Sequence, residues 1–200
     1  MAEVTTLFFD IGGVLLTNAW DRRSRHHCVD SFGLDWEEFQ DRHEFVADAF
    51  ETGHLTIDEY LGRTVFYRDR PFSRAAFIEA MHAESKPLQG GLEFVSNLSD
   101  RYLLATLNNE SKELNEYRIE TFGLRAIFSM FLTSAYLGVK KPDEAIYRRA
   151  LDITQREPEE SVFIDDRSLN LECARDLGLH TIAFENVNQL EAEFARLGIN

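Results

Sequence analysis

The 200-residue sequence predicts a three-layer α/β protein: a parallel β-sheet covered by helices on both faces, with an all-helical unit inserted after the first strand. Two patterns predict this class. From residue 88 onward, short apolar runs alternate with stretches of helical spacing, which favours a parallel sheet with helical crossovers. Between residues 18 and 87 the spacing is helical throughout. We therefore expect a discontinuous core of residues 1–17 and 88–200 and a helical insertion of residues 18–87.

The first strand is expected at residues 4–9, where a short run ends in Phe-Phe-Asp. Thr and Phe favour strands, and the pair Gly12-Gly13 ends the run. The length of the run is typical of a buried strand in a parallel sheet.

The insertion is expected to contain at least three helices with recognisable starts. Asp35 is placed to cap a long amphipathic helix that ends near Gly53. Thr56 opens a Thr-x-x-Glu sequence, which is the form of a capping box. Ser73 is placed to cap a third helix. These starts predict a small helical unit.

The rest of the chain predicts four more strands with helices between them. The strands are expected at residues 102–107, 127–133, 162–165 and 180–184. Asn109 is placed to cap the helix after the first of these, and Gly123 to end it. Pro142 is expected at the first position of the next helix, where proline is favoured. Helices ending at Gly178 and Leu197 complete the pattern.

Composition and charge exclude several classes of protein. The 21 Lys and Arg residues against 35 Asp and Glu give a formal net charge of −14, whereas nucleic-acid-binding surfaces are basic. No apolar run approaches the ~18 residues of a membrane span, and we expect no secretory signal because the first residues are not basic. Cys28 and Cys173 fit no disulfide or metal spacing. We expect a cytoplasmic protein, monomeric or homodimeric.

Polar side chains gather where the predicted strands end, which is the edge at which open parallel sheets bind ligands. Carboxylates that converge in this way repel one another unless a cation lies among them. Ligands that are all oxygen favour a hard ion, Mg²⁺ rather than Zn²⁺. The residues at this edge are Asp10, Asn108, Asn109, Lys140, Lys141, Asp165 and Asp166.

Three motifs, in this order, resemble those of the haloacid dehalogenase superfamily of hydrolases. They are FFDIGGVL at residues 8–15, GVKKP at 138–142 and VFIDD at 162–166. The helical insertion resembles the small cap of one large branch of this family, and the FETGHLT sequence of residues 50–56 resembles a recurrent stretch of such caps. The resemblance covers nearly the whole chain. It implies a Rossmann-like core with an inserted helical cap.

The resemblance also implies a Mg²⁺-dependent phosphatase that acts on a small phosphorylated metabolite, for which a sugar phosphate is plausible. Asp10 is the implied nucleophile, which forms an aspartyl-phosphate. Lys141 is implied to neutralise the phosphate, and Asn108 and Asn109 to help bind it. The implied ligands of Mg²⁺ are Asp10, the backbone carbonyl of Gly12, Asp166 and, directly or through water, Asp165.

Two positions depart from the family pattern. The family's phosphatases usually carry a second Asp two residues after the nucleophile, as general acid and base, and Gly12 stands there. Such catalysis is worth ~10²–10⁴-fold, so we expect substrates whose leaving group needs little protonation, or an acid from the cap such as Glu51 or His54. The family's Ser or Thr at the end of the second strand is Leu107 here, and we expect Thr106 on the other face. Ser111 is an alternative hydroxyl.

Two other functions fit parts of the sequence. A metal-free haloacid dehalogenase would also lack the second Asp and would use Lys141 with Tyr147, but the pair of carboxylates at residues 165–166 argues against it. A non-catalytic binding protein would explain Gly12 and Leu107 together. The basic run at residues 22–26 is expected to be a solvated helix face, or to help hold an anionic substrate. Three phenylalanines are expected in the core of the cap: Phe45, Phe50 and Phe66.

Overall fold

The computed structural model describes residues 2–199 and contains a parallel sheet of five strands in the order β3-β2-β1-β4-β5. The predicted α/β class is confirmed. The first strand, β1, lies in the middle of the sheet, between β2 and β4. Its carboxyl end therefore opens between two neighbours. The strands are β1 (Thr6–Phe9), β2 (Leu103–Asn108), β3 (Met130–Thr133), β4 (Ser161–Asp165) and β5 (His180–Ala183).

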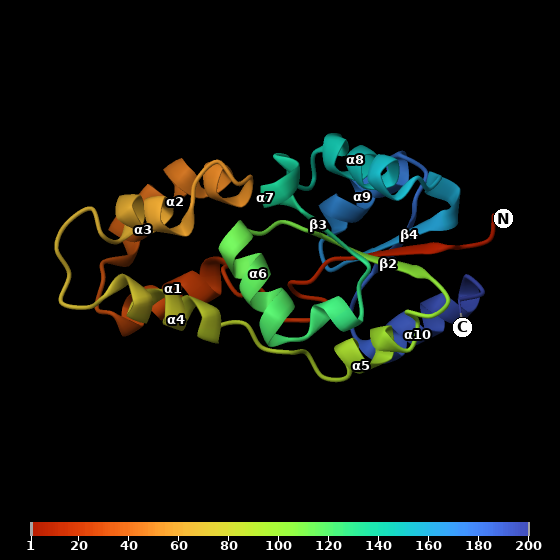
Figure 1. The fold of residues 1–200 in the computed structure, drawn as a ribbon, viewed down its shortest axis with the longest axis horizontal. Helices are drawn as coiled ribbons and strands as arrows, with labels where there is room; N and C mark the ends of the chain where they lie inside the picture. The colour runs from red at the N-terminus through yellow and green to blue at the C-terminus, as the bar shows by residue number, and fades with distance from the viewer. Residues whose placement is uncertain (1, 200) are drawn as a thin grey trace.

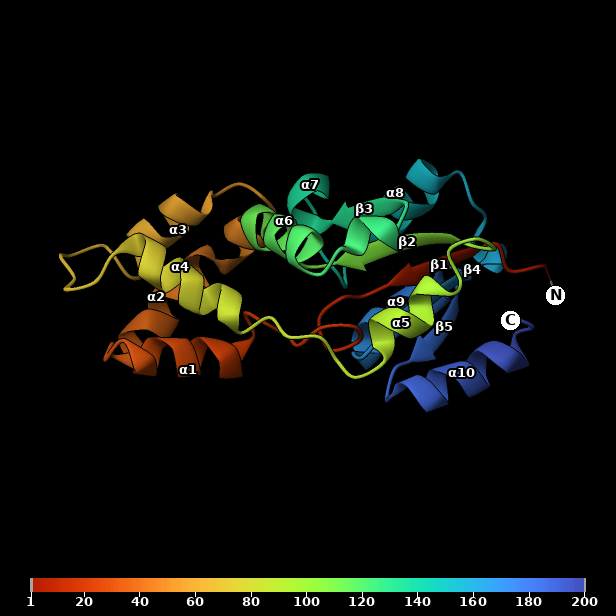
Figure 2. The ribbon, with the colours of Figure 1, turned by 60° about the horizontal axis from the view of Figure 1, so that its bottom comes forward.

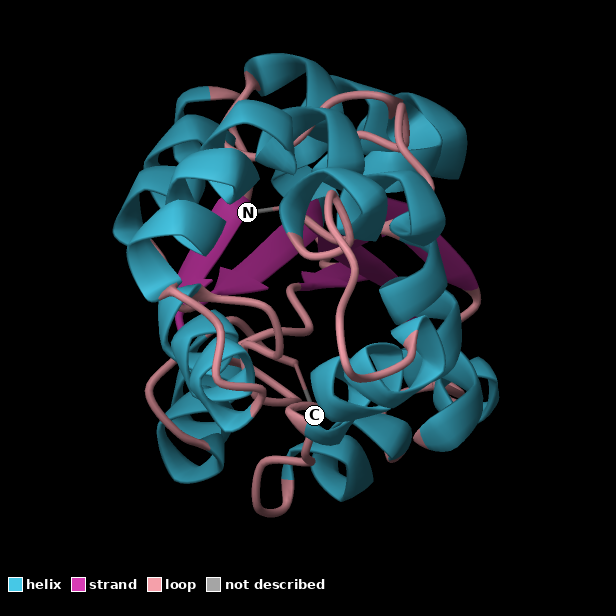
Figure 3. Cartoon of the chain, turned by 90° about the vertical axis from the view of Figure 1, so that its left-hand side faces the viewer, coloured by secondary structure: helices cyan, strands magenta, loops and turns pink. Residues whose placement is uncertain are grey.

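Helices lie on both faces of the sheet, and a second group of helices lies beyond its carboxyl edge (Figure 1, Figure 3). The group beyond the edge consists of α1 (Arg22–Ser31), α2 (Trp36–Glu51), α3 (Ile57–Thr64) and α4 (Arg74–Ala83). The remaining helices are α5 (Gly91–Ser96), α6 (Lys112–Thr121), η1 (Leu124–Ala126), α7 (Ser134–Leu137), α8 (Glu144–Thr154), η2 (Pro158–Glu160), α9 (Ser168–Asp176) and α10 (Val187–Arg196).

The alternation of side chains along β1 builds two separate cores. Leu7 and Phe9 face one side, where Val95 of α5 and Phe194 of α10 pack against them. Phe8 faces the other side, in a cluster with residues of α8 and α9. Because both faces of the strand are covered, nearly every position of β1 is apolar, as expected for a central parallel strand. The sheet is rigidly packed immediately before Asp10.

Helices α1–α4 enclose a third apolar cluster of their own, which includes Phe50 and the partly buried Phe66. The expectation for Phe45 is wrong, because this side chain is 85% exposed. Phe45 lies on α2 beside Val46, whose side chain takes the inward position of that turn. The apolar residues of α2 therefore outnumber the positions on its buried face, and Phe45 is left in solvent.

Two adjacent segments of chain join α1–α4 to the sheet, and they are hydrogen-bonded to each other. The amide of Thr17 donates to the carbonyl of Lys86 at 2.9 Å, and the amide of Leu88 donates to the carbonyl of Leu15 at 2.9 Å. Figure 2 shows both segments between α1 and the sheet. The division into residues 1–17 and 88–200 on one hand and 18–87 on the other stays a prediction.

Two expected helix starts are wrong. Ser111, not Asn109, stands at the N-cap position of α6, and Pro142 is not the first residue of α8, because it precedes the N-cap residue Asp143. Helix α8 begins at Glu144, and the peptide bond before Pro142 is cis. Within residues 2–199, none of the helices combines the length and the apolar character that crossing a membrane requires.

Candidate active site

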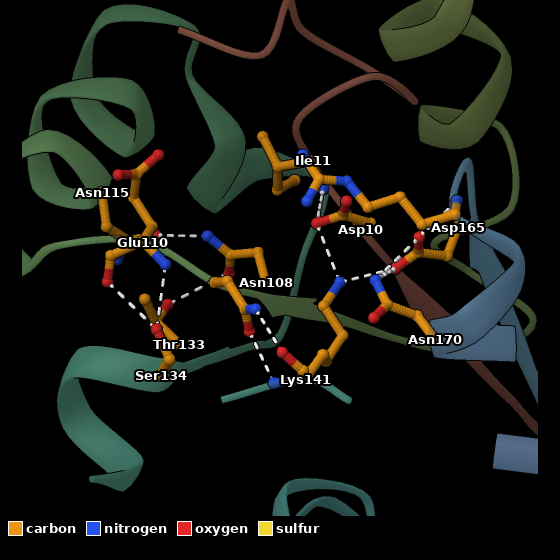
Figure 4. A network of polar contacts seen from close by, with 12 residues as sticks. Asp10, Ile11, Asn108, Glu110, Asn115, Thr133, Ser134, Lys141, Asp165 and Asn170 are labelled. Carbon is orange, nitrogen blue, oxygen red and sulfur yellow. Dashed lines mark hydrogen bonds and ion pairs between the residues drawn. The ribbon is translucent and has the colours of Figure 1, made fainter. Parts of the chain in front are cut away.

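Lys141 lies between two aspartates at the carboxyl edge of the sheet (Figure 4). Its Nζ is 3.1 Å from Oδ1 of Asp10, at the end of β1, and 2.6 Å from Oδ2 of Asp165, at the end of β4. The Lys141 residue is 3% exposed, so both ion pairs are shielded from water. The sequence motifs at residues 8–15, 138–142 and 162–166 thus meet at one point, as the sheet-edge argument predicted.

Asp165 is held by several donors. Its Oδ1 accepts the amide of Arg167 at 2.8 Å, and Nδ2 of Asn170 lies 3.1 Å from Oδ1 and 3.0 Å from Oδ2. The Tyr147 hydroxyl donates to the carbonyl of Asn170 at 2.9 Å. Because both Asp165 oxygens are already engaged, this carboxylate is suited to fixing Lys141 in place.

Asp10, Asp165 and Asp166 form a group that could hold a cation. Each offers a carboxylate oxygen, and these three oxygens lie within 4.8 Å of one another. Gly13 makes room for Asp166: its φ is +79°, and a Cβ at this position would stand 2.2 Å from Oδ2 of Asp166. A side chain at residue 13 would therefore displace the carboxylate as well as strain the turn.

Two carboxyl groups of this cluster have raised pKa values. Burial raises the pKa of Asp10 to about 6, although Lys141 opposes that rise. Burial and the nearby charge of Asp165 also raise the pKa of Asp166. Burial, more than any neighbouring charge, thus disfavours the ionised form of both carboxyls.

Asn108 and Asn109 are both placed at the site, but their side chains are already engaged. Asn109 forms two 2.8 Å bonds with the backbone of Lys141: its Oδ1 accepts the amide and its Nδ2 donates to the carbonyl. Asn108 accepts from the hydroxyl of Thr133 at 3.2 Å and donates to Asn115 over a longer 3.4 Å. Asn109 thus fixes the main chain that carries Lys141.

The position where the family pattern has a hydroxyl is apolar. Leu107 follows Thr106, which pairs with Phe9, so Leu107 lies beside Asp10 on the face of the sheet that bears Phe8. It is fully buried. Thr106 is buried on the opposite face, as predicted. The Ser111 hydroxyl is buried without a hydrogen-bond partner within residues 2–199 and does not line the cleft described next.

A cleft of about 340 Å³ opens between this edge and helices α1 and α2. The predicted residues Asp10, Gly12, Asn108, Asn109 and Lys141 line it. Arg25, from the basic run that the sequence offered as a holder of an anionic substrate, also lines the cleft. Sequence reasoning missed four further lining residues because they belong to none of the motifs: Asn18, His43, Glu110 and Arg118.

The cap acids named from the sequence have different surroundings. Glu51 lines the cleft and pairs with Lys140 at 2.9 Å. His54 is exposed and contacts the Thr52 hydroxyl. The expectation of a wholly solvated basic run is wrong for Arg25, which is 9% exposed. It shares the buried side of α1 with Cys28 and Val29 at helical spacing.

Comparison with known proteins decides the family. The sequence model of the haloacid dehalogenase-like hydrolases matches residues 4–178. The chain belongs to the haloacid dehalogenase-like hydrolase family. Among solved structures of this family, an enzyme of Bacteroides thetaiotaomicron in complex with magnesium and inorganic phosphate superposes with a TM-score of 0.78 and 23% identity, over 94% of this chain and 98% of that one. Its fold is therefore the same.

Two curated relatives act on phosphorylated compounds according to their names. Flavin mononucleotide hydrolase 1 of Arabidopsis thaliana is 30% identical over 171 residues, which are 84% of this chain and 69% of the plant protein. Pyrimidine 5'-nucleotidase of Escherichia coli is 31% identical over 156 residues, 73% of this chain and 69% of the bacterial one. This member of the haloacid dehalogenase-like family is thus similar to hydrolases of organic phosphates.

Proposed function

We propose that this protein is a Mg²⁺-dependent phosphatase of a small phosphorylated metabolite, with Asp10 as the nucleophile. The observation that carries the proposal is that Asp10 and Lys141 line the cleft as an ion pair, with a carboxylate oxygen of Asp166 within 4.8 Å of one of Asp10. A carboxylate nucleophile beside a buried ammonium and a cluster of oxygen ligands is suited to attack on an anionic phosphate. The similarity to two hydrolases of organic phosphates supports the same chemistry.

The residues present fit Mg²⁺. The candidate ligands are all oxygens, which hard cations prefer, and three carboxylates meet within 4.8 Å of one another. We assign Asp10, Asp166 and the carbonyl of Gly12 as direct ligands, and Asp165 as a ligand through water because its oxygens are already hydrogen-bonded. When bound, the metal supplies positive charge that screens the repulsion between Asp10 and the phosphate.

The chain's own residues divide the remaining work. A carboxylate oxygen of Asp10 forms a bond to phosphorus while the bond from phosphorus to the leaving-group oxygen breaks, and water then hydrolyses the aspartyl-phosphate. Lys141 stabilises the negative charge on the transferred group. Asn109 positions Lys141 through its two backbone hydrogen bonds. We assign Asn108 to phosphate binding through the second N–H of its side-chain amide, because the first donates to Asn115 over a long 3.4 Å.

Gly12 bears on the choice of substrate. A Cβ at this residue would stand 2.7 Å from Oδ1 of Asn18, so the Asn18 side chain occupies the place of a residue-12 side chain. With no acid at that position, leaving groups of low pKa suit the site better than alkoxides do. Anomeric sugar phosphates and acyl phosphates have such leaving groups.

The test is phosphate release from a panel of phosphorylated metabolites, with Mg²⁺ and with EDTA, for the wild type and Asp10→Asn. We expect release that needs Mg²⁺ and is lost in Asp10→Asn, whose amide is not a nucleophile. Release that persists in Asp10→Asn would refute Asp10 as the nucleophile. Equal rates for p-nitrophenyl phosphate and a plain alkyl phosphate would refute the leaving-group argument.

The same samples separate the two alternatives. Halide release from a 2-haloacid in EDTA would favour the dehalogenase, although the Tyr147 hydroxyl is committed to the carbonyl of Asn170. Mg²⁺ binding without release of any phosphate would favour the non-catalytic protein, for which Gly12 and Leu107 would be the reason.

We also propose that residues 18–87 act as a cap over the site. The support is their separate apolar cluster and the two hydrogen-bonded segments that join them to the sheet. Closure of such a unit would exclude water from the reaction. A cytoplasmic location accords with the two free thiols, Cys28 and Cys173, and a monomer or homodimer remains our expectation for the oligomeric state.

A further inference from the structure

The wall of the cleft opposite Asp10 carries a buried cation whose charge is not matched by a carboxylate. Arg25 of α1 is 9% exposed and lines the cleft. Its Nη1 donates to the carbonyl of Trp20 at 2.5 Å, and its Nε has no hydrogen-bond partner within residues 2–199. A buried guanidinium in this state is costly unless an anion completes its surroundings.

The carboxylates nearest to Arg25 are committed elsewhere. Glu51 and Asp21 influence its charge, but across the described part of the chain neither comes within the 4 Å of an ion pair with it. Glu51 pairs with Lys140 at 2.9 Å, and Asp21 caps α1 by accepting the amide of Ser24 at 2.8 Å. Burial lowers the pKa of Arg25 from its usual value, which agrees with incomplete compensation.

His43 of α2 adds a second donor to the same wall. The indole N–H of Trp20 donates to the Tyr60 hydroxyl at 3.0 Å, and that hydroxyl lies 2.8 Å from Nδ1 of His43. Tyr60 is fully buried, so its proton has Nδ1 as acceptor. In the neutral ring, Nε2 then carries the hydrogen. Burial, with help from Arg25 and Lys140, lowers the pKa of His43 to about 3, which keeps the ring neutral.

We infer that Arg25 and His43 form a subsite for a second anionic group of the substrate, a carboxylate or a second phosphate, apart from the phosphate that reacts at Asp10. Both side chains line the cleft and present only donors, and an anion offers only acceptors. The inference rests on the proposed function, because it assigns the far end of the same substrate. It predicts a metabolite with two anionic groups.

Matched ligand pairs test this subsite by equilibrium binding in Mg²⁺, on an Asp10→Asn background that stops turnover. One pair is 6-phosphogluconate and sorbitol 6-phosphate, which differ by a carboxylate in place of an alcohol. The other is fructose 1,6-bisphosphate and fructose 6-phosphate. We expect the more anionic member of at least one pair to bind about tenfold tighter or more, as charge-assisted hydrogen bonds do. The pair that shows the preference identifies the carboxylate or the phosphate.

Substitutions on α1 and α2 show which side chains cause the tighter binding of the more anionic ligand. We expect Arg25→Met to reduce it to about twofold or less and His43→Phe to reduce it in part. Arg23→Met, on the exposed side of the same helix, should leave it unchanged. Circular dichroism checks that each variant is folded. The comparison of ligand pairs on Asp10→Asn alone leaves residues 18–87 unchanged, so it tests the subsite even if a variant of α1 or α2 fails to fold.

The outcomes separate this inference from the function on which it rests. Equal binding of both members of each pair would overturn the subsite and leave the phosphatase standing. A preference that survives in Arg25→Met would overturn the assignment to Arg25. If no member of either pair binds although the wild type releases phosphate from other esters, the predicted class of substrate is wrong and the phosphatase stands. If the wild type also releases no phosphate from any ester, both proposals fall together.

Discussion

Asn18 determines what residue 12 can be. Its Oδ1 lies 2.7 Å from the place of a Cβ on Gly12, and its amide lies 2.9 Å from the place of a Cβ on Gly13. The sequence showed that residue 12 is not an acid, but nothing in it marked Asn18, which lies in a loop without a motif. A side chain can therefore be placed at residue 12 only if the Asn18 side chain moves or is removed.

A double substitution tests this pairing. We expect Gly12→Asp alone to push Asn18 aside, whereas Gly12→Asp with Asn18→Ala leaves room for a general acid. The double variant should raise the turnover of glycerol phosphate about 10²-fold relative to that of p-nitrophenyl phosphate, whose leaving group needs no proton. Steady-state rates for the two esters measure the ratio, with Asn18→Ala as control. An unchanged ratio would contradict the leaving-group argument.

Glu110 predicts a pH dependence of stability. Burial raises the pKa of this carboxyl to about 7, even with Arg118 Nη1 3.1 Å away. Its ordinary value is 4.5. Between pH 4.5 and 7 the carboxyl of Glu110 is largely protonated in the native state and ionised in the unfolded state. The free energy of unfolding therefore falls as the pH rises from about 4.5 to 7. The fall should reach at most about 3 kcal/mol.

Glu110→Gln removes this titration. We expect the free energy of unfolding of the variant, relative to wild type, to rise between pH 4.5 and 7 and then to level off. Urea unfolding in EDTA at several pH values measures it, with the exposed Glu120→Gln on α6 as control. A difference that does not vary with pH would show that Glu110 titrates normally.

At the scale of elements, helix starts were predictable where the cap is local. Asp35, Thr56 and Ser73 accept amides within their own first turns, as the sequence predicted. The expectation failed where a distant partner competes. Asn109 is drawn to the backbone of Lys141, thirty-two residues away in the chain, and the helix begins at Lys112 instead. Local sequence carries no signal for such a contact.

Two N-cap residues provide a matched test. The Thr56 side chain accepts the Glu59 amide and Glu59 accepts the Thr56 amide, a complete capping box. The Ser111 hydroxyl makes no capping bond. We expect Thr56→Ala to lower the free energy of unfolding by about 1 kcal/mol, and Ser111→Ala by less than about half of that. Denaturant unfolding measures both. Equal losses would mean that the capping box contributes nothing beyond the helix start.

At the scale of the molecule, Arg118 links the site to both segments that join helices α1–α4 to the sheet. From α6 it pairs with Glu110, donates through Nη2 to the carbonyl of Thr17 at 3.0 Å, and donates through Nε to the Ser85 hydroxyl at 3.2 Å. The side chain is almost fully buried. One residue thus holds the two segments in a fixed relation to the cleft.

Arg118→Met should therefore cost about 3–5 kcal/mol of unfolding free energy at pH 8, because it leaves Glu110 buried without its cation. Adding Glu110→Gln should recover part of the loss. A double-mutant cycle by urea unfolding measures the coupling. If the losses of unfolding free energy from the two substitutions were additive, the ion pair between Arg118 and Glu110 would contribute nothing to stability.

The meeting of distant motifs was predictable at this scale because parallel strands end at one edge. Asp10, Lys141, Asp165 and Asp166 were found in this way. On the α1–α2 side of the cleft, the sequence offered only the basic run of residues 22–26, without saying which of its residues faces the cleft. Arg25 and His43 enter it through the packing of α1 and α2, and helical spacing alone does not say which partner a buried polar residue faces.

The most direct test of the central claim is detection of the covalent intermediate. The protein is mixed with a radiolabelled phosphate ester in Mg²⁺ and quenched in acid, which preserves acyl phosphates. We expect label on the protein that hydroxylamine removes and that is absent from Asp10→Asn. Steady release of phosphate without any acyl-phosphate label, or label that persists in Asp10→Asn, would contradict the assignment of Asp10 as the nucleophile.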